Sequence, residues 1–538
     1  MPKPMRLLLV ALATLCGGVL LKTSDKIVHT VGAELPGALP PQTALAPTPR
    51  STFTPTTRKG YWNADVVGDF TLPKTKTLSF DAAGRNLYGN ENWEKIFKRG
   101  FSSVDITRMF WGTEVTADLS KMPQGWKSRL PFERRSMVVY RGSVQGPPHN
   151  LEWAHHGDLA GQTLFRAPAN ARGGQLQQNI LAVAEGLRGG CYAYGDCPPN
   201  GPRIGVSKLF LDLENDGVEL KNRQEQANIY TYLVKAIRDA ADPRTEFGSI
   251  TPVAHNGFGY SRAADYESGG EWLFSLPAQH TATSRQRGMP DDIVGKSFKD
   301  YVSFHMPGTY FFYPDFDYEG KHTGDADRHW LAGLLSEQEY NIRLTDKKRI
   351  AWHWLFNTQS GAFYNSQKAS HPAPPAVAEG MGIFFWFTGA YGAVLWDDWN
   401  ELKPDQPTPA DPAQQGLGHD RNYACYEHYI HGLWRLFKHH GDLFNGRETY
   451  LNQQTECSFD GGQTWYQFNA NQLKTRGLPF ARAIVNGDQI LVAATMPFAK
   501  PAQRTTLMVR YVQNNYQFYT TLNLKGDEIF LGRATMRR

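Results

Sequence analysis

The chain has 538 residues, of which 41% are hydrophobic and 20% are charged, and its formal net charge at pH 7 is +5. This length exceeds one ordinary hydrophobic core and predicts two or three domains of a globular protein. The small positive excess, without runs of Lys or Arg, excludes a nucleic-acid signature, so we expect no nucleic-acid partner.

The first 23 residues have the pattern of an export signal. Lys3 and Arg6 precede an apolar run, Leu7–Leu21, which is short for a membrane span and has the length of a signal core. Cys16 suggests a lipid-anchor site, although the residue before it is bulky; cleavage near Val31–Ala33 is the alternative. We expect an exported protein, periplasmic, cell-surface or secreted, without a membrane-spanning segment.

Residues 24–58 are dominated by Pro, Thr and Ala and show no hydrophobic periodicity. Such a composition is typical of a disordered or extended segment. We expect a tether between the signal and the first domain.

Residues 59–441 alternate between short β-prone runs and helical patterns. The alternation predicts βαβ units and a parallel sheet. Eight candidate strands favour a (β/α)8 TIM-like barrel over a doubly wound open sheet, which would need a Gly-rich phosphate turn that the sequence lacks. The candidate strands are Lys76–Gly84, Ser102–Gly112, Ser136–Ser143, Ser207–Asn215, Gly248–Gly257, Asp300–Gly308, Arg349–Asn357 and Gly392–Trp399. The candidate helices are Gln175–Leu187, Glu225–Ala240, Pro375–Gly389 and Tyr423–His440.

Residues 442–538 have a different pattern. Short alternating runs are separated by "DGG", "NGD" and "KGD", which are hairpin turn sequences. This pattern predicts a C-terminal all-β sandwich domain.

Two carboxylates end the fourth candidate strand. In "SKLFLDLENDG", Asp212 and Glu214 alternate with Leu211 and Leu213, so the two acids share one face of the strand. Active sites of (β/α)8 barrels lie at the carboxyl ends of the strands. Two acids held close cannot both ionise easily, which supplies a proton donor beside an anion.

The ends of the later strands carry a second acid cluster and many polar and aromatic residues. In "LWDDWNE", Asp397 and Asp398 face opposite ways if the strand persists, so at most one of them is expected to be the partner of Glu214. Aromatic rings stack on sugar faces, while His, Asn and Glu bond hydroxyl groups. The candidate substrate-binding residues are His255, Asn256, His305, Trp352, Trp354, Trp396, Trp399 and Glu401.

The chain resembles secreted bacterial glycoside hydrolases with a (β/α)8 catalytic barrel and a C-terminal β-sandwich. The resemblance rests on "FLDLEND", "WHW" and "LWDDWNE" and on the order of the two domains. The resemblance implies cleavage of glycosidic bonds in a poly- or oligosaccharide, with Glu214 as general acid/base and no cofactor or metal. The Asp212–Glu214 element is also similar to the strand end of family 18 chitinases. Their longer pattern needs Asp where this chain has Ser207 and Phe210, so chitinase activity is not carried over.

The segment "SFDGGQTW", Ser458–Trp465, resembles the Asp-box of sialidases and related propellers. The resemblance implies a hairpin in which Asp460 bonds the backbone and Trp465 packs inside. The motif occurs once, so we interpret it as a structural hairpin of the sandwich.

Two other functions compete with the glycosidase. His255, His305 and His353 end three consecutive strands and Asp397 ends the next, a set that resembles part of a metal-dependent amidohydrolase site; the H-x-H of the first strand is absent. A non-catalytic glycan-binding protein is the other alternative.

The cysteines leave one pairing open. Cys191 and Cys197 flank a short loop and are expected to form a disulfide in an oxidising compartment. Cys425 and Cys457 could pair or stay free.

Overall fold

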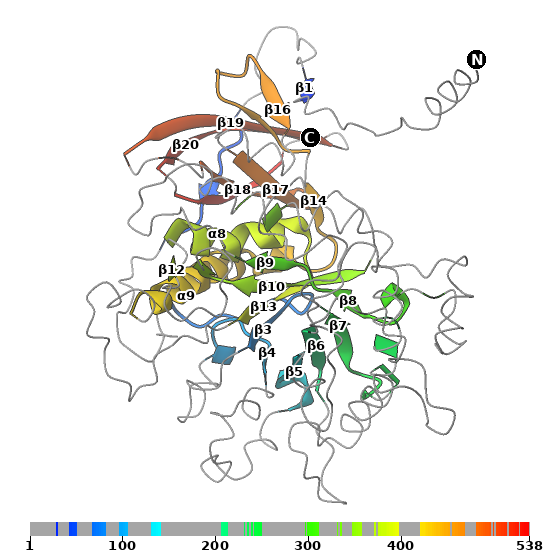
Figure 1. Cartoon of the computed structure of the whole chain (residues 1–538). Helices are drawn as coiled ribbons and strands as arrows, with labels where there is room; N and C mark the ends of the chain where they lie inside the picture. Colours follow the sequence, from blue (N-terminus) through cyan, green and yellow to red (C-terminus); the bar gives the residue numbers. More distant parts are fainter. Residues whose placement is uncertain are drawn as a thin grey trace, which may run out of the picture.

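The structure is a computed structural model of the whole chain (Figure 1). It describes residues 28–30, 42–50, 67–81, 96–105, 131–140, 206–212, 231, 234–235, 238–239, 241–249, 296, 298–310, 331, 334–335, 347–357, 371–372, 375–396, 420–451, 454–467, 480–496, 499, 502–513, 516–526 and 528–536.

Within these residues, a parallel sheet of eight strand positions forms a barrel. Its order is β7-β6-β5-β4-β3-β13-β10, followed by β8 and β9, which together occupy the eighth position beside β10. Each of the eight predicted strands overlaps a described strand, and the (β/α)8 interpretation is confirmed; the fifth, predicted at Gly248–Gly257, begins earlier, at Glu246, and its described part ends at Ser249. Their bounds are β3 Thr77–Asp81, β4 Ser103–Asp105, β5 Arg135–Tyr140, β6 Lys208–Asp212, β7 Glu246–Ser249, β8 Phe304–His305, β9 Gly308–Tyr310, β10 Lys348–Trp354 and β13 Gly392–Trp396.

The barrel closes between β7 and β8. The Ser303 N–H donates to the Phe247 carbonyl (2.7 Å), and the Phe247 N–H reaches Ser303 Oγ (3.2 Å). The close approach needs a glycine, since a Cβ at Gly248 would meet the Phe304 carbonyl oxygen at 2.4 Å. The ring of strands is therefore continuous, and its interior is a packed core rather than an open sheet face.

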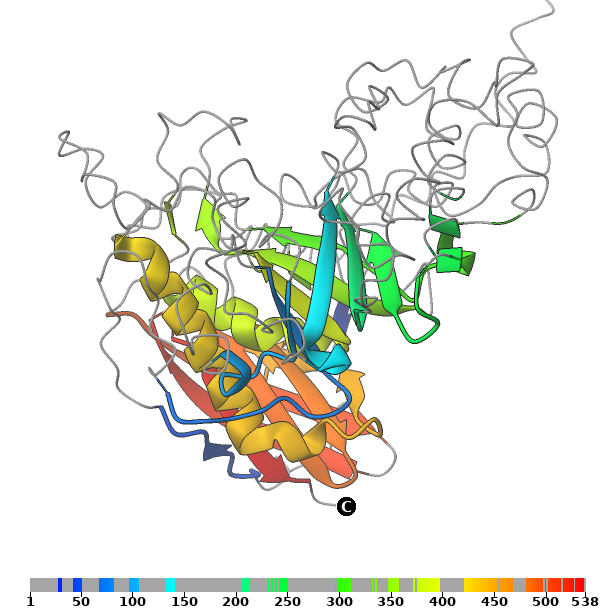
Figure 2. The ribbon, with the colours of Figure 1, turned by 90° about the horizontal axis from the view of Figure 1, so that it is seen from below.

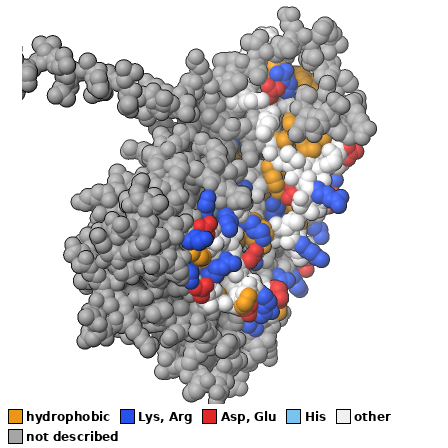
Figure 3. Space-filling view, turned by 90° about the vertical axis from the view of Figure 1, so that its right-hand side faces the viewer, with side chains coloured by type: hydrophobic (Ala, Val, Ile, Leu, Met, Phe, Trp, Pro, Cys, Tyr) orange, Lys and Arg blue, Asp and Glu red, His pale blue; other side chains and the backbone are white. Residues whose placement is uncertain are grey.

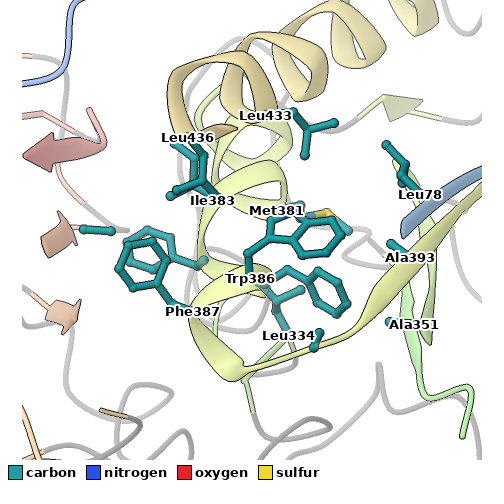
Figure 4. Packing of buried hydrophobic residues seen from close by; sticks show 14 of the residues in the cluster. Leu78, Leu334, Ala351, Met381, Ile383, Trp386, Phe387, Ala393, Leu433 and Leu436 are labelled. Atoms are coloured by element: carbon teal, nitrogen blue, oxygen red, sulfur yellow. The ribbon is translucent and has the colours of Figure 1, made fainter. Parts of the chain in front are cut away.

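Helices cover the outside of the barrel at β10 and β13. The helix α8 (Pro375–Phe384) continues into the 3-10 turn η10 (Phe385–Thr388), as predicted for 375–389; α9 (Asp420–Leu433) begins three residues before the predicted start and continues into the π-helical η11 (Trp434–Lys438). Trp386 and Met381 lie between these helices and the strands that carry Leu78, Ala351 and Ala393 (Figure 4). Among the described residues of 225–240, those at 231, 234–235 and 238–239 are helical.

The α8 and α9 helices cross at very short range. A Cβ at Gly382 would meet the Tyr429 carbonyl oxygen at 2.7 Å, and one at Gly432 would meet that of Glu379 at 2.6 Å. Both positions admit only glycine at this separation. The remaining short elements are η2 Phe132–Arg134, η9 Phe298–Asp300, β11 Phe356–Asn357, β12 His371–Pro372 and η12 Gly441–Leu443.

The C-terminal region forms the predicted sandwich of two antiparallel sheets. One sheet has the order β1-β16-β15-β19-β20 and the other β14-β17-β18-β21-β2. The bounds are β14 Thr449–Leu451, β15 Glu456–Ser458, β16 Trp465–Gln467, β17 Phe480–Asn486, β18 Gln489–Thr495, β19 Arg504–Gln513, β20 Tyr516–Lys525 and β21 Phe530–Thr535. Alternate residues such as Leu507, Val509 and Leu522 are buried between the sheets.

Two pieces of the predicted tether are part of this sandwich. β1 (Val28–Thr30) pairs with β16, and β2 (Ala46–Pro47) pairs with β21. Thr48 Oγ1 lies 2.6 Å from His440 Nε2, which ties the segment to the end of the barrel's last helix. Of the two expected conformations for 24–58, disordered or extended, these residues have the extended one, and backbone pairing with a sheet edge needs no hydrophobic periodicity.

The sandwich packs on the α8 and α9 side of the barrel (Figures 1 and 2). The Phe384 and Phe480 rings meet at 5.5 Å between centroids, joining α8 to β17. A buried charge cluster also lies in this region. It consists of Glu379 of α8, Arg435 of η11 and the His431 imidazole, whose Nδ1 lies 3.6 Å from Glu379 Oε2. Arg50 reaches the same carboxylate from the N-terminal segment at 3.5 Å.

The Asp-box forms the expected hairpin between β15 and β16. Asp460 Oδ1 accepts hydrogen bonds from Ser458 Oγ (2.8 Å) and from the N–H groups of Gln463 (3.0 Å) and Thr464 (2.9 Å). The Trp465 indole N–H donates to the Gly462 carbonyl (3.0 Å), and its ring is buried near Met508 and Tyr519. These bonds stabilise the Asp460 carboxylate and lower its pKa to about 2.

On the face drawn in Figure 3, the described Lys and Arg side chains are intermingled with Asp and Glu. None of the described helices has the length and apolarity to cross a membrane. Cys457 is a free, buried thiol, and burial raises its pKa to about 12.

Candidate active site at the carboxyl ends of the barrel strands

Ring contacts inside the barrel fix which face of each strand points inward. Phe210 of β6 meets Phe304 of β8 at 5.8 Å and Trp352 of β10 at 6.4 Å between ring centroids. The strands that carry Phe210 and Trp352 are separated around the ring by β7 and β8, so this contact crosses the interior. On the opposite wall, Ser79 Oγ of β3 and Ser103 Oγ of β4 lie 2.6 Å apart.

Alternation along each strand then identifies the inward positions at the carboxyl ends. Residue 212 follows Phe210 by two positions, and residue 81 follows Ser79 by two. In the same way residue 354 follows Trp352, and residue 396 is its register partner on β13. Asp81, Trp396 and Trp354 are successive register partners on three neighbouring strands. One end of the barrel therefore gathers acidic and aromatic residues on inward positions.

Asp81 and Asp105 were not among the residues that sequence reasoning selected. Asp81 is the last residue of β3 and is 0% exposed, and Asp105 is the last residue of β4. The signal was present in "KTLSFD" and "SSVD", where an acid closes a β-prone run as Asp212 does in "SKLFLD". Each of these strands therefore ends at an acid, as β6 does.

The amino end of the barrel is closed by an ion-pair cluster. Glu246 Oε1 lies 2.9 Å from Lys348 Nζ, and Glu246 Oε2 lies 3.9 Å from Lys208 Nζ. The Tyr391 hydroxyl donates to Glu246 Oε2 (3.0 Å). Burial and the nearby carboxylate raise the pKa of Tyr391 well above its ordinary value. The sequence-predicted acids lie at the other end, at the carboxyl ends of the strands.

Trp352 has a different environment from the one expected. Its indole is 0% exposed within the interior layer that includes Phe210, so in this structure it packs the barrel core rather than presenting a face for a sugar. A strand residue two positions before the carboxyl end lies one layer deeper in the barrel, which explains the difference.

His305 and His353 face the outside of the barrel. His353 Nδ1 lies 3.0 Å from the Tyr429 hydroxyl of α9, and its ring packs on Phe385 of η10. His305 follows the inward Phe304 and therefore occupies the opposite face of β8. Burial lowers the pKa of each imidazole to about 3.

These orientations correct two predictions. His305 does not lie at the inner surface, so its expected sugar contact is wrong. The amidohydrolase alternative fails as well, because two of its three histidines point away from the barrel interior. Among the residues that the structure describes, no group of three or more His, Cys, Asp or Glu could hold a metal ion.

The other selected residues lie outside the described part of the chain. For Asp212, Trp354 and Trp396 the structure describes the backbone, which lies in a strand, but not the side chain. The selected residues that fall wholly outside it are Glu214, His255, Asn256, Asp397, Asp398, Trp399 and Glu401, together with the cysteines Cys191 and Cys197. Their roles stay predictions.

No family model and no curated protein matches this chain. Solved structures similar to it include a noncanonic maltogenic alpha-amylase, AmyB, from Thermotoga neapolitana, at 10% identity and TM-score 0.40, covering 87% of this chain and 100% of that one. An endo-beta-1,4-mannanase from Thermotoga petrophila matches at 11% identity and TM-score 0.31, covering 73% and 78%. A GH30 endoxylanase from Clostridium papyrosolvens matches at 8% identity and TM-score 0.34, covering 87% and 98%. At these values the comparisons assign no activity, and the functional argument rests on the barrel.

Proposed function

We propose that this protein is an exported glycoside hydrolase that cleaves glycosidic bonds of a poly- or oligosaccharide. The observation that carries the proposal is the set of inward positions at one barrel end, where acids at 81 and 212 accompany tryptophans at 354 and 396. Acids with aromatic platforms are the residues that sugar binding and glycosidic cleavage require.

In this proposal Glu214 is the general acid/base. It follows Asp212 by two residues in the sequence, so we expect it on the same inward side if the alternation of β6 continues. Asp212 orients Glu214 and tunes its pKa, or acts as the second carboxylate. Asp397 or Asp398, just past the end of β13, is the alternative partner. Carboxyl groups about 5 Å apart would give a retaining enzyme, and about 6.5–9.5 Å an inverting one.

Export is the second part of the proposal and rests on the N-terminal sequence. The charged start, the apolar run Leu7–Leu21 and Cys16 support a signal with or without a lipid anchor. Because β1 (Val28–Thr30) pairs with the sandwich, cleavage near residue 23 would keep this strand, whereas cleavage near Val31–Ala33 would remove it. N-terminal sequencing of the exported protein distinguishes the two sites.

The hydrolase is tested by digestion of a panel of α- and β-linked polysaccharides, with product analysis by mass spectrometry. The wild-type protein is compared with Glu214→Gln, which keeps the shape of the side chain and removes its proton transfer. We expect products only from the wild-type protein. Glycan binding that survives in both proteins, with no product from either, would instead support a glycan-binding protein.

A further inference from the structure

We propose that residues 42–50, which we call the strap, close an edge of each sandwich sheet and thereby prevent a second copy of this chain from pairing with these edges. The inference concerns the association of the protein, so it goes beyond the proposed function and does not depend on cleavage of a glycan.

The strap lies along an edge of each of the two sheets. Among the described strands, β20 is the last of one sheet, and β21 would be the last of the other without β2. The Thr43 N–H donates to the Tyr519 carbonyl of β20 (2.8 Å), and the Thr48 N–H donates to the Leu531 carbonyl of β21 (2.9 Å). One short segment therefore bonds to the outer backbone groups of both sheets on the same side of the sandwich (Figure 2).

Side chains hold the strap in this position. Leu45 packs against the hydrophobic core, and Thr48 is buried with its hydroxyl 2.6 Å from His440 Nε2. At the end of the strap, the Arg50 guanidinium lies 3.5 Å from the Glu379 carboxylate at the junction of barrel and sandwich. These contacts come from both the barrel helices and the core, so the strap is a fixed part of the folded protein.

The outer side of the strap offers few hydrogen-bond donors to a further strand. The Thr48 N–H points toward β21, and N–H groups alternate between the two sides of a strand, so the nitrogen of residue 47 points away from β21. That residue is Pro47, which has no N–H, and the exposed Pro49 likewise has none. Proline at such positions is one of the means by which sheet edges avoid pairing with other chains. The strap therefore satisfies the edge of β21 without creating an equivalent edge.

The strands beneath the strap are long enough to pair with another chain. β20 (Tyr516–Lys525) has ten residues and β21 (Phe530–Thr535) has six. An uncovered strand edge presents a row of N–H and C=O groups that another strand can bind. Two copies of this chain without a docked strap carry the same uncovered edges, and like edges can pair about a two-fold axis to form a closed dimer.

The test releases the strap by removing the two N–H groups that it donates to the edges. Thr43→Pro with Thr48→Pro is compared with Thr43→Val with Thr48→Val, which changes the same side chains and keeps both N–H groups. Each variant is made in the full chain, as the cell processes it, and circular dichroism shows whether it is folded. We expect light scattering after size-exclusion chromatography to give the proline variant at least twice the mass of the valine variant and of wild type, in a proportion that rises with protein concentration.

An added peptide distinguishes edge pairing from other association. An excess of a synthetic peptide with the sequence of residues 42–50 should return the proline variant to a monomer, and a scrambled peptide should not. A folded proline variant that stays monomeric at every concentration, or an assembly that the peptide does not reverse, would overturn the inference.

A second variant decides the question if the proline variant does not fold. Pro47→Ala with Pro49→Ala replaces two exposed residues, keeps the strap and restores an outward N–H at residue 47. Association of this variant above that of wild type supports the inference, and a monomer overturns it.

Discussion

Phe210 and Trp352 meet edge to face inside the barrel, with 6.4 Å between their ring centroids and 79° between their planes. This contact joins β6 to β10 across the interior and fixes the inward face of both strands. It places residue 212 on the inward side of β6 and residue 354 on the inward side of β10. The proposed site is built on these two positions.

The two tryptophans of β10 should respond differently to mutation. Trp352→Ala removes a fully buried ring and should lower the free energy of unfolding by about 3–5 kcal/mol. In our proposal Trp354 is a stacking residue, so Trp354→Ala should raise KM several-fold with a smaller loss of stability. Denaturant titration and steady-state kinetics on both variants check this assignment. If KM rose only in folded Trp352→Ala and not in Trp354→Ala, Trp352 rather than Trp354 would be the stacking residue.

The buried charge cluster should stabilise the junction of barrel and sandwich. Glu379→Gln leaves Arg435, which is 2% exposed, without its carboxylate and should cost about 3–5 kcal/mol in the free energy of unfolding. The double variant Glu379→Gln with Arg435→Met should recover much of this loss, because the buried Arg435 charge that lost its carboxylate is then removed as well. Denaturant unfolding of both variants measures the difference; equal stability of the single variant and wild type would contradict it.

The same cluster predicts a loss of stability in acid. Burial alone would raise the pKa of Glu379, but the nearby His431 imidazole and the charges of Arg435 and Arg50 outweigh it and hold the pKa at about 2. A carboxyl group with a lowered pKa in the folded state stabilises above its unfolded value and loses that contribution as pH falls. The advantage of wild type over Glu379→Gln should therefore shrink between about pH 4.5 and pH 2.

Lys76 predicts a gain of stability as the pH rises in the alkaline range. Burial lowers the pKa of its ammonium group to about 8, and Nζ donates to the Ala390 carbonyl (2.9 Å) and the Tyr450 hydroxyl (2.7 Å). In the unfolded chain Lys keeps its proton to about pH 10.4, so between these values the unfolded state binds more protons and stability rises with pH.

The comparison of wild type with Lys76→Met isolates this contribution. Wild type should gain on the variant by about 1.4 kcal/mol per pH unit between about pH 8 and pH 10. The stability of the variant must be subtracted from that of wild type at each pH, because Cys457 titrates in both proteins. Its pKa is raised to about 12, so it lowers the stability as the pH rises through part of the same pH range. A difference that stays constant with pH would show that Lys76 titrates normally.

The sequence predicted the barrel because each strand ends in a recognisable change of residue type. In β6 the apolar run stops at Asp212, and in β13 "GAVLW" stops before two acids. Patterning also predicted the sandwich and the Asp-box hairpin, since the turn residues define the hairpin locally.

Features that depend on distant contacts could not be predicted in this way. β2 has two residues, Ala46 and Pro47, and exists only because β21 offers an unpaired edge. The outward orientation of His353 depends on the position of Tyr429, which is 76 residues away in the chain. Asp81 was passed over although "SFD" carries the same signal as "FLD", because a single acid at a strand end is less conspicuous than the alternating pair Asp212 and Glu214.

The Asp-box hairpin should depend on the oxygen of residue 460 rather than on its charge. Asp460→Asn keeps an acceptor for the N–H groups of Gln463 and Thr464, whereas Asp460→Ala removes it. We expect Asp460→Ala to lower the thermal midpoint by roughly 2–4 °C and Asp460→Asn to change it less. Calorimetry of the two variants measures this, and equal midpoints for both would show that the hairpin is held by Trp465 alone.

The most direct test of the central claim is a crystal structure of Glu214→Gln with an oligosaccharide of the glycan that the wild-type protein cleaves. We predict a sugar ring at the carboxyl ends of β3, β6 and β13, with the scissile oxygen within hydrogen-bonding distance of residue 214. A sugar bound only on the sandwich, or residue 214 directed into bulk solvent with the barrel end vacant, would contradict the assignment.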